Sequence, residues 1–364
     1  MSEERNNLAV ARLYEIAESV YDQLDKGKIP RMILPLRTKK NIRLDRRTGV
    51  WKYGKETGAR SAKRTKGAQM LLRTMYMLEF IQEMIANNKS STLREMYYIS
   101  EGWEKGKFSS QDESNSLAED LEIVTRCMRE DFKLRPEEDG ARVMGDLTLT
   151  ETDRKGKRKK INCRDDVGDS GYGIPYNVEE EKIEFNGTDA NFIMAIETGG
   201  MFDRLVENGF DEDFNSLLIH LKGQPARSTR RFIKRLNEEM GLPVIVFTDG
   251  DPWSFRIFAS VAYGAIKTAH ISDYLATPAT EFIGITASDI TRFKLPTDTL
   301  TDVDVRALKA ELKDPRFNDQ FWQGEIELML DMNKKAEQQA LAKYGLDFVT
   351  DEYLPVKLDE MGMN

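Results

Sequence analysis

Cysteine, histidine and long apolar runs are scarce in this sequence, and each shortage excludes a class of protein or site. The 364 residues include two cysteines, Cys127 and Cys163, and two histidines, His220 and His270. Two cysteines cannot form a disulfide framework or a four-thiolate zinc site. Two histidines exclude a histidine-rich metal site. Any chemistry must therefore depend mainly on carboxylates, tyrosines, lysines or arginines.

Signals for a membrane and for nucleotide binding are missing as well. No apolar run approaches the ~18 residues that a membrane helix needs. The opening residues, MSEERNNLAV, do not have the basic and apolar regions of a signal peptide. We expect a cytoplasmic protein with no membrane contact, associated with the nucleoid. The sequence contains no G-x-x-x-x-G-K-[ST] loop, so any use of ATP would require a partner.

The charge distribution is strongly uneven. The chain is 40% hydrophobic and 32% charged, as in soluble globular proteins, and its length predicts two or three domains. Its net charge is −8, yet residues 26–66 contain 15 Lys or Arg and two acidic residues, which gives this block a charge of +13 and the remainder −21. A local basic patch attracts polyanions whatever the overall charge. This block therefore favours contact with DNA or RNA, and a solvated basic arm is the alternative.

Helical periodicity dominates the first part of the chain. Residues 6–25 have one apolar face, which either packs on the chain itself or binds a partner. A short hairpin is expected near Thr48-Gly49, followed by helices over 68–88, from Thr92, and over about 113–130. Thr92 and Glu95 fit the capping box of a helix start.

Two strand-like runs follow these helices, ARVMGDLTLTET and RKKINC, around the basic turn DRKGKRK. Three helices and a basic hairpin are typical of a winged-helix domain, here CAP-like, which would bind DNA. A small helical bundle with an added hairpin is the alternative. We expect a partner-docking or DNA-contacting extension over 1–66, the winged-helix domain over 67–165 and a further domain over 166–364.

From about residue 170, strands and helices alternate. The runs ANFIMAI, FNSLLIHL, LPVIVFT and ATEFIGIT are predicted strands, and 199–208, 226–240 and 253–268 are predicted helices. This pattern predicts an α/β domain with a mostly parallel, Rossmann-like sheet. Functional sites in such sheets lie at the carboxyl ends of the strands.

Carboxylates stand at two of those strand ends. Glu197 follows ANFIMAI, and Asp249 and Asp251 follow LPVIVFT within DGDP. Mg²⁺ prefers a few carboxylate oxygens completed by water and phosphate, so the three residues are predicted metal ligands. The absence of a nearby histidine or cysteine argues against zinc. The alternative is that DGD only forms a turn.

A basic stretch, LKGQPARSTRRFIKRL, lies just upstream of the aspartates. Cations beside a metal site are typical of an enzyme that handles phosphodiesters. Within this stretch the predicted DNA contacts are Lys222, Arg227, Arg230 and Arg231. A solvated helix face is the alternative.

These motifs together resemble a known family. A glutamate after one strand and D-x-D after another resembles the Toprim fold of topoisomerases, primases and some nucleases. More specifically, LREMYYISEGW, IETGGMF, LKGQPARSTRR and TDGDPWSFRIF are similar to the A subunits of DNA topoisomerase VI, the type IIB topoisomerase. That family also includes the eukaryotic protein that makes meiotic double-strand breaks. The resemblance runs from about residue 68 to the C-terminus. One departure is Ser254, where the wider Toprim pattern often has glycine.

The resemblance implies a type II DNA transesterase. It assigns the nucleophile to Tyr98, an assisting arginine to Arg94, and Mg²⁺ binding to Glu197, Asp249 and Asp251. It also implies a transient 5′-phosphotyrosyl link to double-stranded DNA, an A-subunit homodimer whose sites assemble in trans, and an A₂B₂ heterotetramer. The B subunit would be a GHKL-type ATPase, which binds the ATP and for which the helix over 6–25 is the expected docking site.

Helical geometry separates the two neighbouring tyrosines. Residues four apart share a helix face, so Arg94 can hold a phosphate beside the hydroxyl of Tyr98. Tyr97 lies about 100° round the helix and is expected to pack inward. A meiotic-type break-forming enzyme, a Toprim nuclease or primase, and a non-enzymatic winged-helix DNA-binding protein are the alternatives to a topoisomerase subunit.

Overall fold

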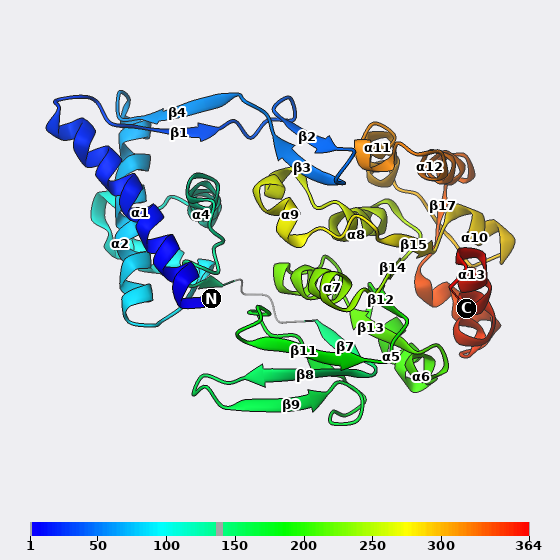
Figure 1. Ribbon diagram of the computed structural model, residues 1–364. Helices are drawn as coiled ribbons and strands as arrows, with labels where there is room; N and C mark the ends of the chain where they lie inside the picture. Colours follow the sequence, from blue (N-terminus) through cyan, green and yellow to red (C-terminus); the bar gives the residue numbers. More distant parts are fainter. Residues whose placement is uncertain (1, 136–140, 364) are drawn as a thin grey trace. The chain divides into compact units, whose positions relative to one another are not determined.

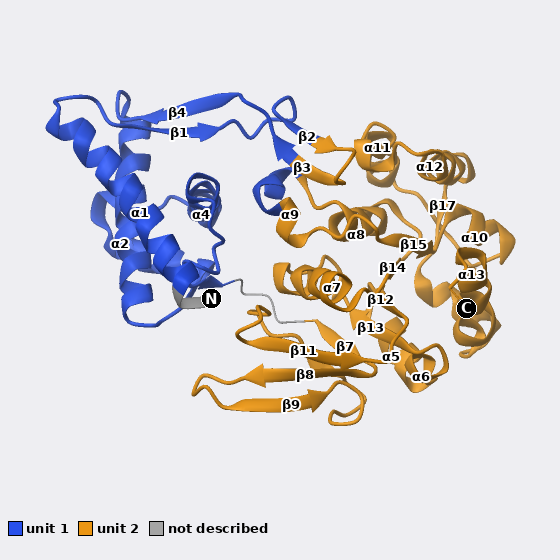
Figure 2. Ribbon diagram, in the orientation of Figure 1, with its two compact units in different colours: residues 1–43, 52–139, 266–271 blue, residues 44–51, 140–265, 272–364 orange. Residues whose placement is uncertain are grey.

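The computed structural model describes residues 2–135 and 141–363, which form two compact units (Figures 1 and 2). Within the described residues, the helical unit comprises 2–43, 52–135 and 266–271. The sheet unit comprises 44–51, 141–265 and 272–363. The units therefore do not divide at 66/67 or at 165/166, where the sequence places domain boundaries. Among these residues, no helix combines the length and the apolar character needed to cross a membrane.

Helices make up most of the helical unit. It contains α1 (Ser2–Asp25), α2 (Thr65–Ala86), α3 (Leu93–Ile99) and α4 (Gln111–Thr125). Strand β1 (Arg31–Pro35) pairs with β4 (Thr57–Ser61), and β5 (Ser91–Thr92) pairs with β6 (Leu134–Arg135). The expected hairpin is formed by β2 (Ile42–Asp45) and β3 (Val50–Tyr53). Its residues 44–51 belong to the sheet unit, and its turn includes Gly49 at φ +69°.

The predicted capping box at the start of α3 is confirmed. The Thr92 hydroxyl accepts a bond from the Glu95 N–H at 3.0 Å, and the Glu95 carboxylate accepts the Thr92 N–H at 2.7 Å, which completes the capping box. Helix α1 packs on α2 and α4. The apolar face of α1 packs partly on its own chain, while Tyr14, Tyr21 and Leu24 are exposed. The buried side chains of α1 include Ala9, Leu13, Ile16 and Val20.

One segment of the helical unit comes from the second half of the chain. The helix predicted over 253–268 ends at Ala262, because Gly264 adopts φ +74° and breaks the helical path. Residues 266–271 then join the helical unit. There the buried His270 Nε2 lies 3.2 Å from the buried Glu122 Oε2 of α4.

Four parallel strands form the centre of the sheet unit. The order of the six-stranded sheet is β10-β7-β13-β12-β14-β15, in which β13, β12, β14 and β15 run parallel and β7 is antiparallel to β13. All four predicted strands are thereby confirmed. The strands are β7 (Arg142–Met144), β10 (Tyr172–Gly173), β12 (Phe192–Ile196), β13 (Ser216–His220), β14 (Val244–Phe247) and β15 (Glu281–Gly284).

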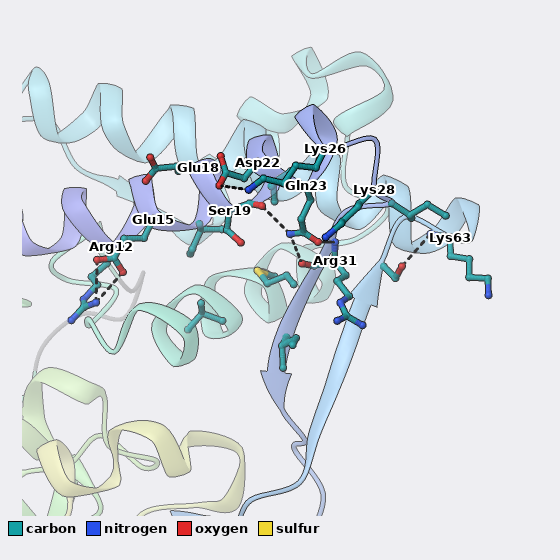
Figure 3. A pocket seen from close by; sticks show the side chains of 17 residues that line it. Arg12, Glu15, Glu18, Ser19, Asp22, Gln23, Lys26, Lys28, Arg31 and Lys63 are labelled. Atoms are coloured by element: carbon teal, nitrogen blue, oxygen red, sulfur yellow. Dashed lines mark hydrogen bonds and ion pairs between the residues drawn. The ribbon is translucent and has the colours of Figure 1, made fainter.

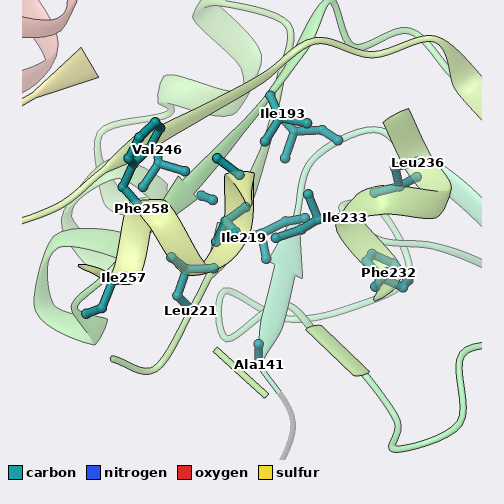
Figure 4. Close-up of a cluster of buried hydrophobic side chains, with 14 of the residues drawn as sticks. Ala141, Ile193, Ile219, Leu221, Phe232, Ile233, Leu236, Val246, Ile257 and Phe258 are labelled. Atoms are coloured by element: carbon teal, nitrogen blue, oxygen red, sulfur yellow. The ribbon is translucent and has the colours of Figure 1, made fainter. Parts of the chain in front are cut away.

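Helices cover both faces of this sheet, which makes it the middle layer of an α/β/α unit. Strand β12 is buried throughout, because alternate side chains enter different clusters. Ile193 joins Ile233 of α7 and Phe258 of α8 (Figure 4), and Met194 joins residues of α5 and α13. The helices are α5 (Gly199–Glu207), α6 (Phe210–Asp213), α7 (Arg227–Met240), α8 (Pro252–Ala262), α9 (Ser272–Leu275), α10 (Ala287–Arg292), α11 (Asp302–Glu311), α12 (Gln320–Met332) and α13 (Leu354–Met361).

The hairpin expected as the wing belongs to a different structure. Strands β8 (Leu147–Thr152) and β9 (Arg158–Asn162) form a sheet in the order β11-β8-β9 with β11 (Ile183–Thr188). All three strands belong to the sheet unit. The β8 side chains Leu147 and Leu149 are buried in the same cluster as β12 and β13, so burial of apolar surface fixes the hairpin there. Two short strands, β16 (Asp298–Thr299) and β17 (Lys334–Lys335), pair antiparallel in the sheet unit.

Candidate active site

The carboxyl ends of β12 and β14 bring the predicted metal ligands together. In the register of these parallel strands Ile196 is opposite Phe247. Glu197 directly follows β12, and its N–H donates to the Phe247 carbonyl at 3.1 Å. The Glu197 Oε2 in turn accepts the Asp249 N–H at 3.1 Å. These contacts bring the ends of β12 and β14 together, and the assignment of the three carboxylates as metal ligands stays a prediction.

Asp251, a predicted metal ligand, also has a structural role. Its Oδ1 accepts the Ser254 N–H at 2.8 Å, which makes Asp251 the N-cap of α8, and Pro252 occupies the first turn. Ser254 is buried, and its side chain hydrogen-bonds Glu197. The serine in place of the usual Toprim glycine thus contacts the predicted metal site.

Burial changes the titration of two carboxyl groups at these strand ends. Burial raises the pKa of Glu197 to about 7, with smaller contributions from the negative charges of Asp249 and Asp251. Burial also raises the pKa of Asp249 to about 6, and Asp251 and Glu337 add to that shift. Across residues 2–135 and 141–363, no three His, Cys, Asp or Glu side chains are grouped closely enough to enclose an ion by themselves. An open pair of carboxylates fits Mg²⁺, which usually binds one or two carboxylates and keeps several waters.

A segment that the sequence did not single out forms another wall of this site. Gly250, between the two aspartates, exchanges backbone hydrogen bonds with Ala336 at 2.8 and 3.2 Å. The N–H of Gln338 donates to Asp249 Oδ1 at 2.8 Å. Burial lowers the pKa of Lys335, but the carboxylate of Asp304 and, more weakly, that of Asp251 raise it overall. These contacts come from a strand pairing that no local pattern indicates.

The predicted nucleophile lies on α3 of the helical unit. Tyr98 is 59% exposed, and Arg94, one turn earlier, is also exposed. Tyr97 is half-buried and packs against the core cluster of this unit. The inward packing expected for Tyr97 is confirmed. The catalytic roles of Tyr98 and Arg94 stay predictions.

The predicted DNA contacts lie in very different surroundings. Arg227 and Arg230 of α7 are buried, at 8% and 7% exposure. Arg231 Nε donates to Glu179 at 3.1 Å, and its guanidinium lies 4.2 Å from the centre of the Tyr274 ring. Lys222 is exposed in the loop after β13, where Gly223 N–H donates to the Glu197 carbonyl at 3.0 Å. Of these four residues, Lys222 alone is exposed.

Comparison with known families assigns a class to both units. Residues 192–358 match a family model described as the Toprim domain of the topoisomerase 6 A subunit and Spo11. Residues 137–189 match "All-beta domain in DNA topoisomerase VI alpha subunit", which accounts for β8, β9 and β11, and residues 69–134 match "Type IIB DNA topoisomerase". The Toprim prediction is thereby confirmed, and the class indicated is that of the type IIB DNA topoisomerases.

Curated relatives narrow the assignment. The chain is 58% identical over 351 residues to the A subunit of type 2 DNA topoisomerase 6 from Archaeoglobus fulgidus, a match covering 96% of this chain and 97% of the relative. It is 56% identical over 360 residues to the protein of the same name from Natronomonas pharaonis, covering 98% and 97% of the two chains. The Methanosarcina barkeri protein is 56% identical over 361 residues, covering 99% and 97%. The chain belongs to the family of type 2 DNA topoisomerase 6 A subunits.

Proposed function

We propose that this chain is the DNA-cleaving and rejoining subunit of an ATP-dependent type II DNA topoisomerase, with Tyr98 as its nucleophile. The observation that carries the proposal is the combination of an exposed tyrosine on α3 with carboxylates at two adjoining strand ends of a Toprim domain. The family membership supports the reaction class.

In the proposed reaction the Tyr98 hydroxyl attacks a backbone phosphorus of DNA. A bond forms between the tyrosine oxygen and phosphorus, the bond from phosphorus to the 3′ oxygen breaks, and the tyrosine proton is released. The strand that leaves carries a free 3′ hydroxyl, and the other remains on the enzyme through a 5′-phosphotyrosyl link. Arg94 would hold the phosphate from the same helix face. Because one phosphoester replaces another, religation needs no ATP.

Glu197, Asp249 and Asp251 would hold the divalent ion, which we propose is Mg²⁺. When bound, the ion supplies positive charge for phosphate oxygens. Support comes from the hydrogen bond of the Asp249 N–H to Glu197 Oε2, which brings the two acidic strand ends together. Lys222 is the best-supported proposed DNA contact of this unit. It is exposed, and the N–H of the following residue, Gly223, donates to the Glu197 carbonyl.

A duplex break needs two nucleophiles, and each chain offers Tyr98 once. We therefore propose a homodimer on double-stranded DNA in which each tyrosine works with the partner's carboxylates, because Tyr98 and the carboxylates belong to different compact units. The ATP-binding B subunit would complete an A₂B₂ heterotetramer that acts on the nucleoid in the cytoplasm. For the helical unit we propose a winged-helix type of DNA binding through α2, α3 and α4, without the β8–β9 hairpin as its wing.

Helix α1 is the proposed docking site for the B subunit. It is fixed to its own unit, because Gln23 Nε2 donates to the Arg31 carbonyl at 3.1 Å and Gln23 Oε1 accepts the Arg31 N–H at 3.0 Å (Figure 3). The exposed aromatic side chains Tyr14 and Tyr21 are then available to a partner. Tyr14 also lines a groove of about 290 Å³ between α1 and α2, whose other lining residues include Val10, Leu13, Ala17, Met75 and Leu78.

Binding assays with the B subunit test this docking site. We expect Tyr14→Ala combined with Tyr21→Ala to weaken association at least tenfold, because truncated aromatic anchors at interfaces often cost more than about 2 kcal/mol. Glu18→Ala, an exposed position on the same helix, is the matched control. Unchanged association of the double variant would remove α1 from the proposed interface.

A plasmid cleavage assay tests the nucleophile. The chain is mixed with the B subunit, ATP, Mg²⁺ and supercoiled plasmid, and covalent protein–DNA adducts are counted after denaturation. Adducts should disappear in Tyr98→Phe and persist in Tyr97→Phe, which differs by the same oxygen atom. Adducts lost only in Tyr97→Phe would overturn the choice of Tyr98. Cleavage without an adduct would instead identify a Toprim nuclease.

Two further results separate the remaining alternatives. ATP-dependent relaxation of the plasmid is expected of a topoisomerase and not of an enzyme that only makes breaks. Glu197→Gln and Asp249→Asn should abolish cleavage while DNA binding stays measurable. Loss of DNA binding in both variants would contradict a role limited to the metal.

A further inference from the structure

Gln338 is completely buried beside the acidic strand ends, although no motif of the sequence points to it. Its exposure is 0%, and it begins the short 3₁₀ helix Gln338–Tyr344. The backbone pairing of Gly250 with Ala336, two residues earlier, fixes this segment against the loop that carries Asp249 and Asp251. The Gln338 N–H donates to Asp249 itself. The side chain therefore starts from a fixed point next to the carboxylates.

The side-chain amide of Gln338 connects both acidic strand ends. Its Nε2 donates to the Phe247 carbonyl, the last residue of β14, at 3.2 Å. Its Oε1 accepts the hydroxyl of Thr198, the residue after Glu197, at 3.0 Å. The Phe247 carbonyl also accepts the Glu197 N–H, so this one oxygen accepts from both the Gln338 amide and the Glu197 backbone. Through this single amide, the Thr198 side chain beside Glu197 is tied to the backbone that leads to Asp249.

Only an amide of this length satisfies both contacts. One end must donate to a carbonyl and the other must accept from a hydroxyl, and a buried group that lacks its partner costs free energy. A glutamate would turn a carboxylate oxygen toward the Phe247 carbonyl, and a methionine would make neither bond. The Gln338 amide thus adds a side-chain link to the backbone bond that already joins these two strand ends.

We propose that Gln338 is a positioning residue of the metal site, which sets the separation of Glu197 and Asp249 and thereby the affinity for a divalent cation. The inference rests on the proposed metal site and adds a residue that touches neither the ion nor the DNA. Residues that orient metal ligands typically change metal affinity by 10–100-fold when they are replaced.

Binding of Mn²⁺ to the full chain without DNA tests the proposal, with free Mn²⁺ measured by electron paramagnetic resonance. We expect Gln338→Met to raise the Mn²⁺ dissociation constant by about 10–100-fold. Thr198→Val should have an effect in the same direction, and Thr198→Ser, which keeps the hydroxyl, should restore the affinity. Gln320→Met, the same change at an exposed position of the sheet unit, is the matched control.

The double variant separates a direct link from general damage. If the two side chains act as one unit, Gln338→Met combined with Thr198→Val should bind Mn²⁺ about as weakly as the weaker single variant. Multiplicative effects of the two substitutions would overturn the link. A Gln338→Met protein within about twofold of the wild type, with an unchanged thermal transition, would overturn the proposal itself. If Gln338→Met shows no cooperative transition, the comparison of Thr198→Val with Thr198→Ser decides.

The same titration distinguishes failure of the inference from failure of the metal site. If the wild type does not bind Mn²⁺, or if Asp249→Asn binds it equally well, the proposed metal site is wrong and Gln338 has no such role. If Asp249→Asn loses binding while Gln338→Met keeps it, the metal site stands and only the inference is overturned.

Discussion

Replacing Asp304 tests how the loop that carries Asp249 and Asp251 is held in place. Its carboxylate is 2% exposed and accepts bonds from the Trp253 indole N–H at 3.0 Å and the Lys335 ammonium at 3.0 Å. It also completes the capping box of α11 by accepting from the N–H and the hydroxyl of the N-cap residue Thr301, each at 2.9 Å. Trp253 follows the D-x-D motif by two residues, and Lys335 precedes the Ala336 that pairs with Gly250. The buried Asp304 carboxylate thus connects Trp253, just after the D-x-D motif, with Lys335 of the segment that pairs with Gly250.

We expect Asp304→Asn to lower the free energy of unfolding of the sheet unit by about 3 kcal/mol at pH 7. Breaking a buried ion pair by removing one partner costs about 3–5 kcal/mol. The lower end applies because the Lys335 side chain is 25% exposed and can turn toward water. The asparagine can still accept from Thr301, so most of the loss should come from Lys335 and Trp253. Urea unfolding followed by tryptophan fluorescence measures the difference.

The pH dependence of this difference has a definite sign. Burial alone would raise the pKa of Asp304, but the hydrogen bonds from Thr301, Lys335 and Trp253 outweigh it and hold the pKa well below the usual range. A depressed pKa in the folded state means that the stabilisation is complete above the unfolded value of about 3.9. It is lost as the pH falls below that value. The gap between wild type and Asp304→Asn should therefore be full at pH 7 and narrow below about pH 4.

Asp302→Asn, an exposed position in the first turn of the same helix, is the matched control and should change stability by less than about 0.5 kcal/mol. The reasoning fails if Asp304→Asn costs less than about 1 kcal/mol at pH 7, which is the worth of a helix cap alone. It also fails if the gap is the same at pH 7 and at pH 3.5.

Three further predictions concern other parts of the chain. Thr92→Ala should destabilise the helical unit by about 1 kcal/mol in urea unfolding, because it removes the hydroxyl that caps α3, and Thr92→Ser should restore the stability. Gly49→Ala should lower the melting temperature, since its φ is +69° and a Cβ would lie 2.5 Å from Pro278 Cβ; an unchanged melting temperature would contradict the turn geometry. Removal of divalent ions with EDTA should stop DNA cleavage while DNA binding persists in a filter assay, and cleavage that survives EDTA would contradict metal dependence.

Local patterns were sufficient for the elements that carry the predicted site. The buried run of β12 and the apolar run of β14 identified parallel strands, and the rule for their carboxyl ends brought Glu197 and Asp249 together. Helix periodicity also separated the packed Tyr97 from the exposed Tyr98. In each case the signal lies within a few residues of the feature it predicts.

Contacts between distant segments could not be predicted in this way. Gln338 meets Asp249 because residues 334–338 return to the sheet after α12, and no periodicity indicates that return. The burial of Arg227 and Arg230 was missed for a related reason. A row of arginines indicates charge, whereas the face on which α7 packs depends on strands that lie far away in the sequence. The β8–β9 hairpin was assigned to the wrong unit because β11, its partner in the sheet, follows it by more than twenty residues.

The return of residues 266–271 to the helical unit limits how this protein can be divided. A fragment that ends before β7 would contain Tyr98 and helices α1 to α4, but it would lose His270, whose ring lies beside the buried Glu122. N-terminal fragments that end before β7 should therefore be less stable. A fragment joined by a short linker to residues 266–271 should be more stable than these. The unit that presents the tyrosine is discontinuous in sequence, so it could not be exchanged between proteins by a single crossover between genes.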